Sequence, residues 1–148
     1  MIETDTPSSY IADSSALFAL YSTTDALHAA AIRAIDALRA ERATILTPAD
    51  VFSETMNLIG RRIGHRAATE AATLLLEADQ FIVVETTADV RTAALAKLMD
   101  TPDSVSFTDC VAMSVADRYD TKLILGFDQA FRRSGYLIPD HATASSGG

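Results

Sequence analysis

The segment Ser106–Asp128 constrains the fold more than any other part of this chain, because a helix pattern is followed closely by a strand pattern. Asp109 lies at the start of the expected helix. One apolar face of that helix is expected at Ala112, Val115, Ala116 and Tyr119. Leu123–Leu125 is a short apolar run, typical of a strand covered on both faces, and Asp128 follows it. The segment therefore predicts a parallel sheet with its acids at the edge where open α/β folds bind ligands.

Strands and helices alternate along the rest of the chain. Further strands are expected at Ser9–Ala12, Thr44–Leu46 and Phe81–Val84, with a short edge strand at Tyr136–Ile138. Helices are expected at Ala16–Tyr21, after Asp25, after Pro48, at His65–Ala78, at Ala88–Met99 and, as a short turn, at Ala130–Arg133. This alternation predicts an α/β fold, a three-layer α/β/α sandwich around a mainly parallel sheet of four to five strands.

Length and composition favour one globular domain. The chain has 148 residues, of which 49% are hydrophobic, so we expect a single domain over residues 1–140 and a disordered tail over 141–148. No apolar run approaches the roughly 20 residues that span a bilayer, and the first residues do not resemble a signal peptide. Cys110 is the single cysteine, which excludes an internal disulfide and favours a packing role. These features predict a cytoplasmic protein.

The net charge of −8 argues against broad binding of nucleic acid through a basic surface. It leaves a nucleic-acid enzyme possible, because carboxylates that hold divalent cations raise the number of acids. A bound cation then reverses the sign of the local charge.

Four acids stand out by position. Asp13 ends the first expected strand, Glu54 lies on the helix after the second, Asp109 begins the helix before the fourth, and Asp128 follows that strand. For each acid taken alone a structural role is the better explanation, such as a helix cap at Asp109 or a turn at Asp13. Gathered together they need a cation, since two like charges about 4 Å apart repel by roughly 4 kcal/mol at an effective dielectric of 20. An all-oxygen site suits Mg²⁺ and predicts metal-assisted hydrolysis of a phosphodiester.

The helix after Pro48 has two faces. Its apolar residues are expected to pack inward at Phe52, Met56, Ile59 and Ile63. Asp50 and Glu54 begin a polar stripe near the end of the second strand, so either acid can face the site.

Four short motifs occur in order: YIADSSAL, TPADVFSETMNLI, SFTDCVAMSVA and LILGFDQAF. Together they resemble the PIN domain, and within it the VapC-type toxin ribonucleases of bacterial toxin–antitoxin pairs. The resemblance covers about Tyr10 to Ile138. It implies a parallel sheet flanked by helices, a Mg²⁺ or Mn²⁺ cofactor, endonucleolytic cleavage of RNA, a homodimer and a small antitoxin partner. It also implies that the metal-binding and catalytic residues are Asp13, Glu54, Asp109 and Asp128, with Glu54 preferred over Asp50.

One position departs from the family pattern. Thr or Ser often stands two residues before the last acid, where this chain has Gly126, so a hydroxyl contact is lost. Ser14 and Thr108 match the usual hydroxyl neighbours of the acids, and we expect supporting roles for both, with simple helix capping as the alternative.

Basic residues gather in two places. They are Arg61, Arg62 and Arg66 beside His65, and Arg132 beside Arg133. Contact with RNA phosphates, contact with an acidic partner such as an antitoxin, and a solvated helix face all explain them.

Two other classes of function share a small parallel α/β fold. A receiver-type phosphoacceptor domain needs an acid pair after the first strand and a lysine after the last, whereas Ser14 follows Asp13 and Gly126 follows the fourth strand. A catalytically silent binding module of the same fold is the remaining alternative, and the intact set of acids argues against it.

Overall fold

The computed structural model describes residues 8–138 and has a four-stranded, wholly parallel sheet at its centre. The strands are β1 (Ser9–Ala12), β2 (Thr44–Pro48), β3 (Phe81–Val84) and β4 (Ile124–Leu125), in the order β3-β2-β1-β4. This sheet confirms the predicted α/β sandwich. In place of the expected edge strand at Tyr136–Ile138, Leu137 forms an isolated bridge with Leu123. The predicted tail and the ends of the predicted domain lie outside the described residues.

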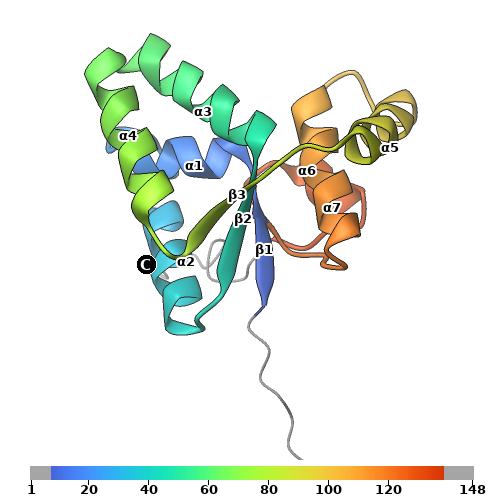
Figure 1. The fold of residues 1–148 in the computed structure, drawn as a ribbon, viewed down its shortest axis with the longest axis horizontal. Helices are drawn as coiled ribbons and strands as arrows, with labels where there is room; N and C mark the ends of the chain where they lie inside the picture. The colour runs from blue at the N-terminus through green and yellow to red at the C-terminus, as the bar shows by residue number, and fades with distance from the viewer. Residues whose placement is uncertain (1–7, 139–148) are drawn as a thin grey trace, which may run out of the picture.

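Helices cover both faces of the sheet. They are α1 (Ser14–Tyr21), α2 (His28–Ala40), α3 (Ala49–Arg62), α4 (His65–Glu77), α5 (Ala88–Met99), α6 (Phe107–Arg118) and α7 (Gln129–Arg133). Figure 1 shows α1–α4 on one side of the sheet and α5–α7 on the other. Within residues 8–138, no helix is both long enough and apolar enough to cross a membrane.

The strands divide the core into two layers because successive side chains point to opposite faces. Ile11 of β1 packs in one cluster with Val111 and Val115 of α6. Its neighbours Tyr10 and Ala12 belong to a second cluster on the side of α1 and α2. Burying a side chain such as Ile11 contributes about 1.5–3 kcal/mol, so β1 is held from both sides.

Helix α6 is buried along most of its length. Every residue from 110 to 116 is buried, which no single apolar stripe predicts. Cys110 is among them and burial raises the pKa of its thiol, as expected of a packing residue. Tyr119, expected on the buried face, is instead the C-cap of α6 and about half exposed.

The inward face of α3 differs by one residue from the expected face. Its buried residues are Val51, Thr55 and Ile59, whereas Phe52 and Met56 are half-buried and Ile63 is exposed. The Thr55 hydroxyl donates to the carbonyl of Val51 at 2.7 Å. A threonine can therefore face the core without leaving its hydroxyl unpaired. The buried face of α3 is for this reason not the one that the apolar residues alone predict.

A polar contact fastens the C-terminal segment to α5 and α6. The Tyr136 hydroxyl donates to Asp117 Oδ1 at 2.7 Å, and Lys97 Nζ lies 2.8 Å from Asp117 Oδ2. Tyr136 is only 4% exposed. Burial, together with the bond to Asp117, raises its pKa to about 12, so the phenol stays protonated and keeps donating at physiological pH.

We expect Tyr136→Phe to lower the free energy of unfolding by about 1.5–3 kcal/mol, because it removes a hydrogen bond to a charged group. Urea denaturation measures this difference. The matched control is Tyr119→Phe, whose side chain is about half exposed and whose change should stay within about 0.5 kcal/mol. Equal losses in the two variants would show that the Asp117 contact does not stabilise the fold.

Candidate active site

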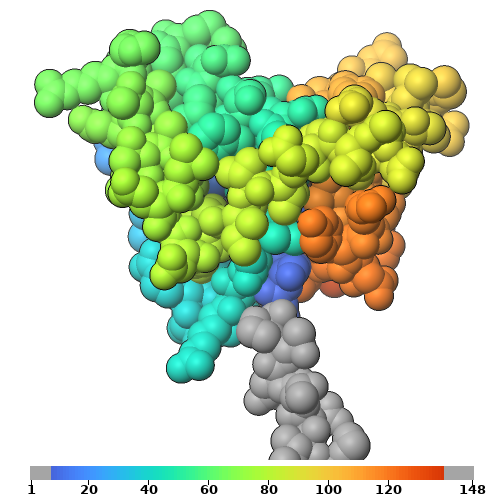
Figure 2. All heavy atoms as spheres, in the orientation of Figure 1, coloured from blue at the N-terminus to red at the C-terminus, as the bar shows by residue number. Residues whose placement is uncertain are grey.

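The carboxyl ends of the parallel strands form one edge of the molecule, and the predicted acids lie along it. Asp13 follows β1, Asp128 follows β4, and Glu54 lies on α3, which leaves the end of β2. The N-terminus of α6 brings Asp109 to the same edge (Figure 1). Figure 2 shows the surface dipping at this edge between α3 and the α5–α6 pair.

Asp13 is the buried member of the set, with 2% of its surface exposed. It is the N-cap of α1, and its Oδ2 accepts hydrogen bonds from the Ser15 hydroxyl at 2.7 Å and the Ser15 N–H at 3.3 Å. Its Oδ1 is buried and has no hydrogen-bond partner within the described part of the chain. Burial, aided by the negative charge of Asp109 and opposed by the Ser15 bonds, raises the pKa of Asp13 to about 7.

Asp109 is held by a capping box at the start of α6. Its backbone N–H donates to Ser106 Oγ, and its own Oδ2 accepts from the Ser106 N–H, both at 3.0 Å. Burial raises the pKa of Asp109, and the charges of Asp128 and Glu54 raise it further. The carboxylates of all four predicted residues are therefore electrostatically linked, with Asp109 as the shared neighbour.

Asp128 and Glu54 are the exposed members. Asp128 is the N-cap of α7, and its Oδ1 accepts from the Ala130 N–H at 2.9 Å. Glu54 lies on the second turn of α3, while Asp50 is half-buried on the first turn. It is the charge of Glu54 that acts on Asp109, in line with the preference for Glu54.

The donor set suits a hard divalent cation, because it offers carboxylate oxygens alone. Among residues 8–138 the buried Asp13 Oδ1 has no hydrogen-bond partner, which leaves an oxygen able to bind a cation. As they stand, no three His, Cys, Asp or Glu side chains in residues 8–138 are grouped closely enough to hold a metal ion. A cation held by these carboxylates would have to draw them closer together, and its charge would offset their mutual repulsion.

Two serines that the sequence analysis missed support the acids. The hydroxyls that contact Asp13 and Asp109 are those of Ser15 and Ser106. Ser14 acts on Asp13 through its backbone N–H, and the supporting roles of the Ser14 and Thr108 side chains stay predictions. Ser106 could have been found from the sequence, because S-x-x-D before an apolar helix is a capping-box pattern.

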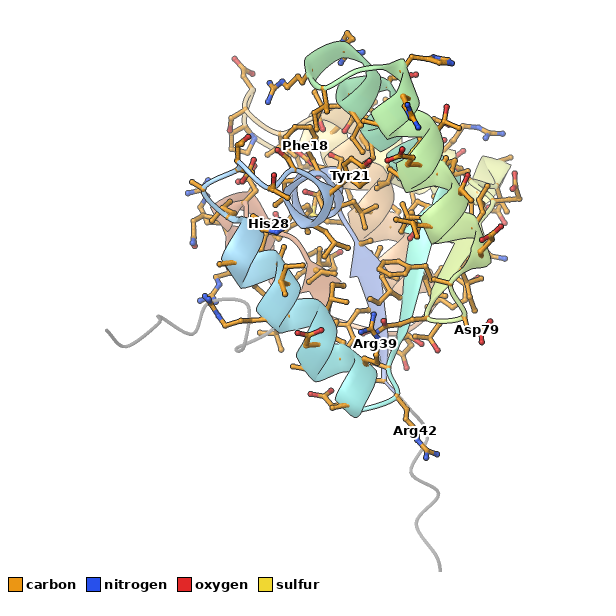
Figure 3. All side chains as sticks on the ribbon, turned by 90° about the vertical axis from the view of Figure 1, so that its left-hand side faces the viewer. Phe18, Tyr21, His28, Arg39, Arg42 and Asp79 are labelled. Carbon is orange, nitrogen blue, oxygen red and sulfur yellow. The ribbon has the colours of Figure 1, made fainter. Side chains whose placement is uncertain are left out.

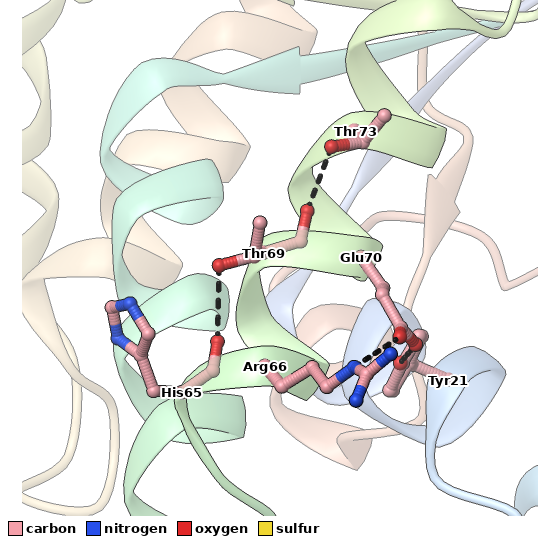
Figure 4. A network of polar contacts seen from close by, with 6 residues as sticks. All are labelled: Tyr21, His65, Arg66, Thr69, Glu70 and Thr73. Carbon is pink, nitrogen blue, oxygen red and sulfur yellow. Dashed lines mark hydrogen bonds and ion pairs between the residues drawn. The ribbon is translucent and has the colours of Figure 1, made fainter.

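The predicted arginines do not form one patch. Arg61 and Arg62 end α3 and Arg66 begins α4, whereas Arg132 lies on α7 across the sheet (Figure 1). Arg66 Nε lies 3.4 Å from Glu70 Oε1, and Figure 4 shows Tyr21 donating to the same carboxylate. The Arg62 guanidinium lies 5.6 Å from the centre of the Phe18 ring. Their roles as RNA or partner contacts stay predictions.

An apolar cavity of about 350 Å³ lies elsewhere, between α1, α2 and α4. Tyr21 and Arg39, both visible in Figure 3, are among its lining residues. None of the four predicted acids lines it, so the candidate chemistry is at the open sheet edge and not in this cavity.

The pKa of Asp13 predicts how stability depends on pH. The folded chain holds a proton at Asp13 up to about pH 7, whereas the unfolded chain releases it near pH 3.8. Without metal, stability should therefore fall as the pH rises from about 4 to 7. Asp13→Asn should reduce this slope, of which the raised pKa of Asp109 leaves a part, and stabilise the metal-free protein at pH 8 by about 1–3 kcal/mol.

Urea denaturation in EDTA at several pH values measures the effect. Asp36→Asn, at a largely exposed carboxylate on α2, serves as the matched control and should keep the wild-type slope. Parallel pH profiles for wild type and Asp13→Asn would contradict the assignment of the buried carboxyl.

Two comparisons with known proteins found similarities. The PIN domain family profile matches residues 10–135. The crystal structure of Mycobacterium tuberculosis VapC20, described as a Sarcin-Ricin loop cleaving toxin, superposes with a TM-score of 0.74 at 30% sequence identity. The match covers 86% of this chain and 96% of VapC20. A search of curated proteins found no match. The family profile spans most of the sequence and all four acids, and the chain therefore belongs to the PIN domain family.

Proposed function

We propose that this chain is a divalent-metal-dependent endoribonuclease and the toxin of a type II toxin–antitoxin system. One observation carries the proposal: the charges of four carboxylates from separate segments are linked through Asp109, and Oδ1 of Asp13 is buried with no partner in the described part of the chain. A binding surface has no need of a buried carboxylate that destabilises the metal-free fold. A cation site needs such a carboxylate as a ligand, and the bound cation offsets the free-energy cost of burying its charge.

Asp13 and Asp109 would be the central ligands of Mg²⁺ or Mn²⁺. Bound there, the ion supplies activation of a water and neutralisation of charge on the scissile phosphate. Ser15 holds Asp13, and Ser106 orients Asp109. Glu54 and Asp128 are exposed, so they face the solvent from which RNA and water arrive, and they complete the acidic set.

RNA is the substrate class that the similarity to VapC20 supports, since that protein is described as cleaving the Sarcin-Ricin loop. We propose the same class for this chain. An oligonucleotide of that loop is the first substrate to assay, beside an unstructured RNA of equal length.

The proposed partners are a small cognate antitoxin and a second copy of the chain, acting in the cytoplasm. The similarity to VapC20 supports the antitoxin, and the family resemblance supports the second copy. Light scattering of the purified chain measures the homodimer, and mass spectrometry of the proteins that co-purify with the chain identifies the antitoxin.

A catalytically silent module of the same fold is the alternative. It predicts that Mn²⁺ leaves the melting temperature unchanged. The proposed nuclease predicts a rise, since an ion at 100 times its Kd contributes about 2.7 kcal/mol to stability.

We expect Asp109→Asn and Asp13→Asn each to lower the rate of Mn²⁺-dependent RNA cleavage by about 100-fold or more, because each removes a charged ligand from the site. Single-turnover cleavage of a labelled RNA measures the rate. Asp36→Asn is again the matched control and should cleave like wild type. Undiminished cleavage by both site variants would overturn the assignment of the acids.

Arg61 is the arginine of the α3–α4 turn best suited to a phosphate. It is exposed, and in residues 8–138 no acid lies within ion-pair distance of it, whereas Arg66 is paired with Glu70. Arg61→Gln should weaken RNA binding and reduce the slope of log Kd against log salt by about 1.

The matched control is Arg42→Gln. Arg42 lies between α2 and β2, at the opposite end of the strands from the acids (Figure 3). Binding titrations of the catalytically impaired Asp109→Asn protein, at several salt concentrations, give the slopes. Identical slopes for the two arginine variants would remove Arg61 from the RNA surface.

A further inference from the structure

Gly126 lies at a point where no side chain fits without displacing a neighbour. A Cβ atom built on it would lie 3.0 Å from the Cβ of Asp13 on one side. On the other side it would lie 3.0 Å from Cε2 and 3.3 Å from Cδ2 of the Phe131 ring. Such separations are shorter than ordinary carbon–carbon contacts of about 3.5–4.0 Å, so a substituent must push Asp13, Phe131 or both.

Asp13 has little freedom to move. Its backbone N–H donates to the carbonyl of Leu125 at 2.9 Å, directly before Gly126. Its carboxylate is tied to Ser15 at 2.7 Å and caps α1. A side chain at position 126 would therefore displace the Asp13 carboxylate. It would do so either by rotating the Asp13 side chain or by lengthening the backbone hydrogen bond from Asp13 to Leu125.

Phe131 is held as firmly. It is fully buried in the cluster that contains Ile11 and α6. Its N–H donates to the carbonyl of Asp128 at 3.2 Å, and its own carbonyl accepts from the Tyr136 N–H at 2.9 Å. A side chain at position 126 that displaced the Phe131 ring would therefore also shift α7, whose first turn is capped by the Asp128 carboxylate.

We infer that Gly126 and Phe131 are a matched pair of positioning residues that sets the placement of Asp13 and Asp128 for the cation. This inference rests on the proposed function, because it concerns the same acids. The Phe131 ring fills the space that a side chain at position 126 would take, and Gly126 lets Asp13 lie against that ring.

The pair also accounts for the departure from the family pattern. A hydroxyl residue at position 126 would bring its Cβ against both Asp13 and the Phe131 ring, and these neighbours would have to give way by a few tenths of an ångström. In this chain the hydroxyl that supports Asp13 is that of Ser15.

The test is Mn²⁺ binding by titration calorimetry, with the metal alone as ligand, to wild type, Gly126→Ala, Phe131→Leu and the double variant. We expect Gly126→Ala to weaken Mn²⁺ binding by about 10-fold, the usual effect of disturbing the support of metal ligands. The double variant should bind more tightly than Gly126→Ala, because leucine vacates the contact. Such non-additivity is the mark of residues that share one space.

The matched control is Gly60→Ala. A Cβ there would meet Ala68 Cβ at 3.8 Å, an ordinary contact, so Mn²⁺ binding should be unchanged. Melting in EDTA separates the roles, since a purely structural glycine would change the melting temperature and leave the affinity alone. If Gly126→Ala does not fold, recovery of folding and Mn²⁺ binding in the double variant supports the pair, and failure to recover overturns it.

Unchanged Mn²⁺ affinity in Gly126→Ala, or strictly additive losses in the double variant, would overturn the pairing while leaving the proposed nuclease intact. Absence of Mn²⁺ binding by the wild-type protein would contradict the proposed function, and the inference with it.

Discussion

The buried carboxylate of Asp13 is the constraint on which the candidate site depends. It lies at the end of a central strand, is almost fully inaccessible to water, and has one oxygen without a partner in the described part of the chain. Burial of this kind raises the pKa to about 7, so the metal-free chain is held in a fold that disfavours the charge it carries. A proton or a cation relieves that cost, and the proposed hydrolysis of a phosphodiester uses the cation.

Helix capping explains how the acids reach one edge. Asp13 and Asp128 are N-caps of α1 and α7, and Asp109 closes a capping box at the start of α6. In each case a carboxylate oxygen accepts from a backbone or hydroxyl donor of its own helix start, which fixes the side chain relative to the sheet. The same local bonds that begin the helices thus position the residues proposed to bind a cation. Capping and ligation are not alternatives here, because each carboxylate has two oxygens.

The edge of the sheet and its acids could be predicted from the sequence, because the carboxyl ends of parallel strands all lie on one side of the sheet. Details of packing could not. The buried face of α3 includes Thr55, whose hydroxyl donates to a carbonyl of its own helix. Because threonine is a polar residue, the sequence pattern does not identify this position as part of the core. Gly126 reads as a missing hydroxyl until the positions of Asp13 and Phe131 are known, since those residues meet only in the folded chain. The sequence shows Ser15 and Ser106 as possible capping residues. It does not show whether they or their neighbours Ser14 and Thr108 contact the acids, because that depends on the direction of each side chain.

The most direct measurement is anomalous diffraction from crystals grown with Mn²⁺. We expect a manganese peak at the sheet edge, with Asp13 Oδ1 and a carboxylate oxygen of Asp109 at about 2.0–2.2 Å, the bond length of small hard divalent cations. The capping contacts of Ser15 and Ser106 should persist around the ion. A manganese ion bound away from Asp13, or none at this edge at millimolar Mn²⁺, would contradict the assignment of Asp13 as the central ligand.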